Sequence, residues 1–127
     1  MRLYARAAEL GDTEATMFLG VSHHNGDGVK LNTRKAAKFY HMAADRGQTK
    51  ALVLLGELMY QNKDFSESVR FFGLAAARGS PSAPYSLAGH YQYGKGVPKD
   101  LDEARRLFAL AAARGWEEAE EALAKLG

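Results

Sequence analysis

The stretch APYSLAGHYQYGKGVPKDLDEARRLFALAAARG, residues 83–115, decides the fold because its landmarks recur along the chain. It ends with the pattern Ala-Ala-x-x-Gly. Copies of this pattern along the chain end at Gly11, Gly47, Gly79 and Gly115, at intervals of 36, 32 and 36 residues. Alanine follows each of these glycines after four residues and leucine after eight, and an aromatic residue precedes each glycine by seven. Four copies in one register indicate an internal repeat.

Each repeat unit reads as two helices. Apolar residues between the glycines keep the i, i+3, i+4, i+7 spacing of a helix face, as at Ala51, Leu54, Leu55 and Leu58. A single helix hairpin cannot bury such a face, so successive hairpins must stack. We predict one domain over residues 1–127, with a half-repeat helix at 1–10, repeats at 11–46, 47–78 and 79–114, and a capping helix at 115–127. The helices are expected near 2–10, 13–24, 33–46, 49–61, 65–78, 82–93, 101–114 and 117–126, with no strands.

Two units, residues 15–47 and 83–115, fit the pattern A-x3-L-G-x2-Y-x2-G-x-G-V-x2-D-x2-K-A-x3-Y-x2-A-A-x2-G. The chain therefore resembles the Sel-1-like repeats, a branch of the tetratricopeptide-type helical solenoids, over nearly its whole length. The middle unit, residues 51–79, lacks the G-x-G-V segment and is four residues shorter. The expected fold class is all-α, a right-handed α-solenoid of stacked antiparallel helix hairpins.

The glycine-rich segments GDGVKLN, residues 26–32, and GKGVPKD, residues 94–100, could cradle a phosphate or simply turn the chain. A phosphate loop needs a preceding strand and a helix opening on its last glycine, and here a helix comes first. We therefore predict turns. Gly26 and Gly94 should end helices with positive φ, and Val29 and Val97 should fold back as apolar plugs. The next helices should be capped at their N-termini by Asn32, Asp64 and Asp100. Glu67 and Glu103 should complete capping boxes with Asp64 and Asp100.

No constellation of residues favours catalysis. The chain has no cysteine, which excludes disulfides and thiolate metal sites, and no Gly-x-Ser-x-Gly nucleophile elbow. The histidines, His23, His24, His41 and His90, form no paired i, i+4 ligand set. Acidic residues cluster only at Glu117, Glu118, Glu120 and Glu121, as in a solvated helix at the end of a solenoid. We expect no enzyme activity, no cofactor and no metal.

The charge and hydropathy of the chain limit the classes of partner that we expect. Seventeen basic and 15 acidic residues leave a net charge of +2, without the basic surplus that favours nucleic acid. No apolar run approaches the roughly 20 residues that span a bilayer, so we expect no membrane insertion. The first residues lack the apolar core and cleavage site of a secretory signal, which favours the cytoplasm without fixing the compartment.

The resemblance implies where a partner binds. In tetratricopeptide-type solenoids the first helix of each unit lines a concave groove, which holds a peptide or helix of another protein. Counted from the small residue after leucine, the candidate partner-binding residues are Met17, Val21, His24, Val53, Glu57, Tyr60, Tyr85, Gln92 and Tyr93. A second, basic surface could form on the outer helices from Arg34, Lys35, Lys38, Arg46, Arg105, Arg106 and Arg114.

The function implied is that of a non-catalytic protein–protein interaction scaffold or adaptor. Two alternatives stay open: a module that binds cell-wall or other glycans or regulates an enzyme, and a purely structural spacer of a longer array. Residues 1–10 read as the second helix of a unit whose first helix is missing. We expect a fragment of a longer array, and the alternative is that the first hairpin was lost naturally. The apolar face of that helix, with Leu3 and Tyr4, then becomes a candidate surface for self-association.

Overall fold

A computed structural model describes residues 11–26 and 32–126 of the chain. In these residues it contains no strand and seven α-helices: α2 (Thr13–Asn25), α3 (Thr33–Asp45), α4 (Thr49–Gln61), α5 (Phe65–Ala77), α6 (Ser82–Tyr93), α7 (Leu101–Ala113) and α8 (Glu117–Leu126). The ends of these helices agree with the sequence prediction to within a residue. The predicted helix at 2–10, with Leu3 and Tyr4, lies outside the described residues, as does Val29.

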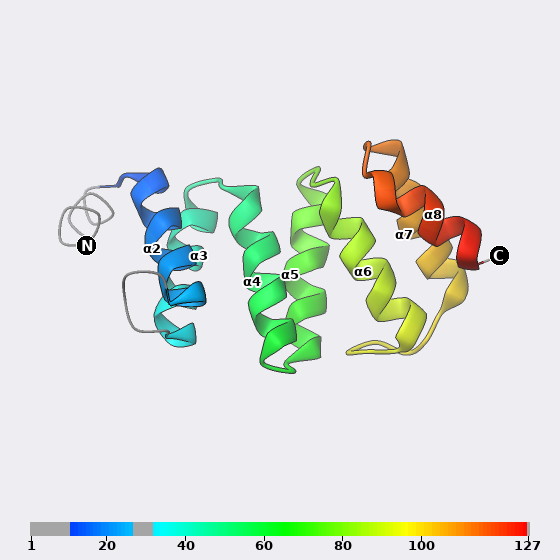
Figure 1. Ribbon diagram of the computed structural model, residues 1–127, viewed down its shortest axis with the longest axis horizontal. Helices are drawn as coiled ribbons and strands as arrows, with labels where there is room; N and C mark the ends of the chain where they lie inside the picture. The colour runs from blue at the N-terminus through cyan, green and yellow to red at the C-terminus, as the bar shows by residue number, and fades with distance from the viewer. Residues whose placement is uncertain (1–10, 27–31, 127) are drawn as a thin grey trace.

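The helices form three hairpins and a final single helix, and each packs on the helices next to it in the chain. Figure 1 shows the hairpins side by side in a row, with α2 and α8 at opposite ends. The all-α solenoid of helical repeats is therefore confirmed. The contacts within a hairpin are more extensive than those between hairpins, so the hairpin is the packing unit.

The Ala-Ala-x-x-Gly pattern ends the second helix of each unit. At the end of α3, the Ala43 carbonyl accepts from the Gln48 amide at 3.1 Å, and the Ala44 carbonyl accepts from the Gly47 amide at 3.0 Å. This is the Schellman pairing, in which the glycine takes a left-handed conformation, here with φ 93°. The same bonds recur at Ala75, Ala76, Gly79 and Ser80, and at Ala111, Ala112, Gly115 and Trp116.

The small residue after leucine lets the two helices of a hairpin approach. A Cβ atom added at Gly56 on α4 would lie 2.8 Å from ring carbons of Phe72 on α5, and one at Gly20 would lie 2.6 Å from the ring of Tyr40. Phe72 and Tyr40 are the repeated aromatic residues seven positions before Gly79 and Gly47, and both are buried. The aromatic ring of the second helix thus packs directly on the backbone of the first.

The segment GKGVPKD is a turn. Gly94 ends α6 in the left-handed conformation, with φ 69°, and its amide donates to the His90 carbonyl. Gly96 also has positive φ, 76°, and a Cβ there would lie 2.5 Å from the Phe65 carbonyl oxygen. The glycines therefore turn the chain and let it pass close to α5. Val97 is only half-buried, so it is a weaker plug than predicted.

The predicted helix caps form, but the capping boxes do not close. The Asp100 carboxylate accepts from the Glu103 amide at 3.0 Å, whereas the Glu103 carboxylate pairs with Arg106. The Asp100 amide instead donates to the Tyr91 carbonyl on the preceding helix, at 2.9 Å. This bond closes the loop and leaves no amide for Glu103 to accept from. The Asp64 carboxylate likewise caps α5, and the Asp64 amide donates to the Met59 carbonyl. The Asn32 side chain caps α3, and the Asn32 amide donates to the His23 carbonyl.

Two arginines before the repeat glycines couple neighbouring hairpins. Arg114 Nη1 donates to the Ala76 carbonyl of α5 and to the Ser80 carbonyl of the loop before α6, at 2.9 Å each. Arg78 Nη1 reaches the Ala44 carbonyl of the preceding hairpin at 3.4 Å, whereas Arg46 Nη1 donates to Thr16 Oγ1 within its own hairpin, at 2.7 Å. Arg105 and Arg106 pair with acids on their own helix. Much of the basic surface considered for the outer helices is thus engaged inside the protein.

The loop after α6 is tied to the core by His90, which is 3% exposed. Its Nδ1 lies 2.8 Å from the Lys95 carbonyl oxygen, so Nδ1 carries the proton and donates. Its Nε2 lies 3.1 Å from Ser68 Oγ, which lies 2.8 Å from the Gly56 carbonyl. Burial lowers the pKa of His90; the bond to the Lys95 carbonyl opposes this, and the positive charge of Lys95 adds to it.

We predict that Gly56→Ala destabilises the protein by about 1–3 kcal/mol, because the new methyl group overlaps the buried ring of Phe72. Gly73→Ala is the matched control, since a Cβ at that position in α5 meets nothing within 4 Å. It should stabilise by about 0.5–1 kcal/mol through helix propensity alone. Urea unfolding followed by circular dichroism measures both. Equal effects of the two variants would contradict the packing described.

We predict that stability falls as the pH drops below about 6.5, the ordinary pKa of histidine. The unfolded chain then takes up a proton at residue 90 that the folded protein, with its lowered pKa, resists. The His90→Gln variant lacks this titration but keeps His23, His24 and His41. Urea unfolding at pH 7.5 and 5.5 should therefore show a larger loss for the wild type than for the variant. Parallel pH profiles would rule out the role assigned to His90.

Candidate partner-binding groove

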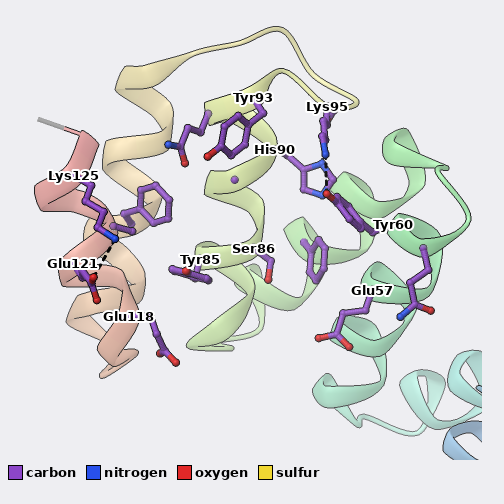
Figure 2. A pocket seen from close by; sticks show the side chains of 16 residues that line it. Glu57, Tyr60, Tyr85, Ser86, His90, Tyr93, Lys95, Glu118, Glu121 and Lys125 are labelled. Atoms are coloured by element: carbon purple, nitrogen blue, oxygen red, sulfur yellow. Dashed lines mark hydrogen bonds and ion pairs between the residues drawn. The ribbon is translucent and has the colours of Figure 1, made fainter. Parts of the chain in front are cut away.

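A cavity of about 650 Å³ opens on the side of the solenoid lined by the first helices α4, α6 and α8. We call it the α4–α6–α8 cavity (Figure 2). Its ring-bearing residues are Tyr60, Phe72, Tyr85, His90, Tyr93 and Phe108, and its charged residues are Glu57, Lys95, Glu118, Glu121 and Lys125. Gln61, Ser86, Gly89, Gln92 and Ala122 complete the lining.

Five of the nine residues predicted to bind a partner line this cavity: Glu57, Tyr60, Tyr85, Gln92 and Tyr93. They come from α4 and α6, whose first-helix positions repeat along the chain. The register of the repeat sets which helix face looks outward, so positions chosen by resemblance to tetratricopeptide repeats fall on one face of these helices.

The other four predicted residues lie outside the cavity. Met17, Val21 and Val53 are half-buried and pack against the hydrophobic core. His24 is held between helices: its Nε2 lies 2.7 Å from Gln61 Oε1, and its Nδ1 lies 2.9 Å from the Tyr40 hydroxyl. Since an amide oxygen only accepts, His24 donates from Nε2 and accepts from Tyr40.

The Tyr40 hydroxyl stays protonated in this arrangement. Burial, and then the negative charge of Glu57, raise the pKa of Tyr40 to about 12. The bonds from Tyr40 through His24 to Gln61 join α3, α2 and α4 across the first two units. These polar groups therefore bond to one another in the free protein.

The aromatic wall of the cavity is partly preformed. Tyr85 packs edge-on against Phe108, with ring centroids 5.5 Å apart, and lies 6.2 Å from the ring of Trp116. Trp116, directly before α8, thereby joins the last helix to the preceding hairpin. Tyr93 is 69% exposed, the largest exposed fraction among the large apolar side chains of the described residues. One tyrosine thus packs against other rings, and the other is largely exposed.

Lys95 was not foreseen as a cavity residue. It lies in the loop after α6, and its Nζ donates to the Tyr60 hydroxyl at 2.8 Å. The ammonium group also lies 5.0 Å from the centroid of the Tyr60 ring and 5.4 Å from that of Phe65. These cation–π contacts hold it at one end of the cavity. They join a loop of one unit to a helix of the preceding one, so no pattern within a unit reveals them.

Within residues 11–26 and 32–126, no three histidine or acidic residues lie close enough together to hold a metal ion. No helix there is both long and apolar enough to cross a bilayer.

The Sel1 repeat pattern matches residues 1–12, 13–48, 49–80 and 81–116. An uncharacterized protein of Neisseria meningitidis serogroup B is 34% identical over 93 residues, which are 73% of this chain and 20% of that protein. The chitin synthase regulator SKT5 of Saccharomyces cerevisiae is 32% identical over 103 residues, covering 76% of this chain and 15% of the regulator.

Two solved structures share the fold. A Sel1 repeat protein from Oxalobacter formigenes has a TM-score of 0.86 and 31% identity, over 98% of this chain and 53% of its own. A protective antigen of uropathogenic Escherichia coli with an SLR fold has a TM-score of 0.84 and 28% identity, over 97% of this chain and 27% of its own. The chain spans a fifth or less of the curated relatives and about half or less of these structures. With its pattern matched from residue 1 to residue 116, the chain belongs to the Sel1 repeat family.

Proposed function

We propose that the chain is a non-catalytic adaptor that holds a segment of a partner protein in the α4–α6–α8 cavity. Sel1 repeat proteins are generally protein-interaction scaffolds. The observation that carries the proposal is the cavity itself, which has a volume of about 650 Å³, is built from two hairpins and α8, and is lined by aromatic and charged side chains. This volume lies within the roughly 300–1,000 Å³ of typical ligand sites.

The composition of the lining suits a protein segment. Tyrosine is enriched among residues that dominate binding energies, because its ring supplies large contact area and its hydroxyl a polar end. Tyr85 is held by its neighbours, so little of its conformational freedom remains to be lost when a partner binds. Tyr93 adds an exposed ring on the same helix. The two together could clamp an apolar or aliphatic side chain of the partner.

An enzyme-regulatory role is a narrower form of the same proposal. The yeast relative is named as a regulator of chitin synthase, and this chain matches 15% of it. If this chain also regulates an enzyme, the enzyme would supply the segment that enters the cavity. The glycan-binding and spacer alternatives predict different binding results for the Gly89→Leu variant.

We predict that Gly89→Leu abolishes partner binding without unfolding the protein. Gly89 lines the cavity, and a Cβ there meets nothing within 4 Å, so the larger side chain projects into the space a partner would fill. Wild type, Gly89→Leu and the control Gly73→Leu, on α5 outside the cavity, are immobilised and exposed to an extract of the source cells. Bound proteins are quantified by mass spectrometry, and circular dichroism reports folding.

The proposal requires a protein that the wild type and Gly73→Leu retain and that Gly89→Leu retains at least tenfold less. Equal retention by all three folded proteins, or no retention, would favour the spacer. Binding of a purified glycan that Gly89→Leu abolishes, with no protein retained, would favour the glycan alternative.

A further inference from the structure

Only some of the charged side chains that line the α4–α6–α8 cavity form ion pairs. Glu121 pairs with Lys125 at 3.1 Å on α8. Lys95 is held by the Tyr60 hydroxyl and two aromatic rings. Glu57 and Glu118 also line the cavity, and among the described residues neither forms an ion pair. Among the described residues Lys95 forms no ion pair either, so three glutamates and two lysines give the lining a net charge of −1.

The two acids come from opposite walls. Figure 2 shows Glu57 on α4 and Glu118 on α8 toward the same end of the cavity, with Lys95 at the other end. Glu118 lies in the first turn of its helix, where the N-terminal dipole favours a carboxylate. Glu57 lies in the third turn of α4, far from such an end. The negative charge of Glu57 adds to the effect of burial in raising the pKa of Tyr40.

Gly89 leaves space for an occupant at the wall of the cavity. A glycine inside a helix costs about 0.5–1 kcal/mol relative to alanine, and Gly89 lies in the middle of α6. Gly20 and Gly56 occupy helix interiors because an aromatic ring packs on them, but nothing lies within 4 Å of a Cβ at Gly89. The packing of the free protein therefore does not require this glycine. The absent side chain instead leaves room at the cavity wall between Tyr85 and Tyr93 for a partner to approach the backbone.

These features select the chemistry of the occupant. An acidic side chain would meet two unpaired carboxylates, and a purely apolar one would leave them without partners. A basic side chain can both pack on the tyrosines and pair with the carboxylates. Its aliphatic stem packs on the tyrosine ring, and its cationic end is attracted to aromatic rings and carboxylates. Arginine, with its planar fork of donors, can bond to a carboxylate and stack on a ring at once.

Resting on the proposed function, we infer that the partner segment presents an arginine or lysine side chain, which lies against Tyr85 and reaches the end of the cavity where Glu57 and Glu118 lie. The backbone of that segment passes close to Gly89. The site thus selects basic segments among the proteins that could fit its shape.

The test uses a phage-displayed library of random 12-residue peptides selected on the whole chain. Peptides enriched by the wild type, and not by Gly89→Leu, should share a basic residue at one fixed position. The Kd of the best peptide should rise about tenfold with the double variant Glu57→Gln, Glu118→Gln, as expected for the loss of close charge pairs. Glu120→Gln is the matched control, since Glu120 is exposed on α8 and does not line the cavity; it should leave the Kd unchanged.

Replacing the shared basic residue of the peptide by methionine should remove most of the difference between wild type and double variant. Enriched peptides that depend on Gly89 but share no basic residue, or bind the double variant equally well, would overturn the inference while leaving the adaptor function intact. If no enriched peptide depends on Gly89, both the groove proposal and this inference fail.

Discussion

The rest of the structure depends on the contact between a small residue on the first helix of a hairpin and an aromatic ring on the second, as in the first two hairpins. Tyr40 lies on Gly20 and Phe72 on Gly56, each closer than an added Cβ would allow. This contact sets the distance between the two helices, and the arginines and glycine turns then stack one hairpin on the next. The groove follows, because stacking places the first helices beside one another.

The helices and part of the groove could be predicted because the repeated positions are those that stack. A register kept through Gly47, Gly79 and Gly115 sets the helix ends and the outward face of each first helix. What could not be predicted are contacts that cross between units. Lys95 reaches Tyr60, and His90 reaches Ser68, and both pairs join different hairpins through residues that do not repeat. Such contacts depend on the rotation between units, which spacing within one unit leaves undetermined.

The cavity owes its position to differences between the units. In the first unit His24 bonds to Tyr40 and Gln61, so polar groups that could face a ligand are already paired. In the third unit Gly89 occupies the position held by Val21 and Glu57, and the wall between α4 and α8 stays open. The repeat therefore supplies the scaffold, whereas the departures from the repeat supply the site.

The most direct test of a partner in this cavity is photo-crosslinking from position 93. The photoreactive residue p-benzoylphenylalanine replaces Tyr93 at the cavity, or, as the control, Leu74, which is 42% exposed on the outer helix α5. After irradiation in source-cell extract, mass spectrometry identifies the joined peptides. A protein segment joined at position 93 and not at 74, and displaced by Gly89→Leu, is the predicted result. Crosslinks from position 74 alone, or from both equally, would contradict the account.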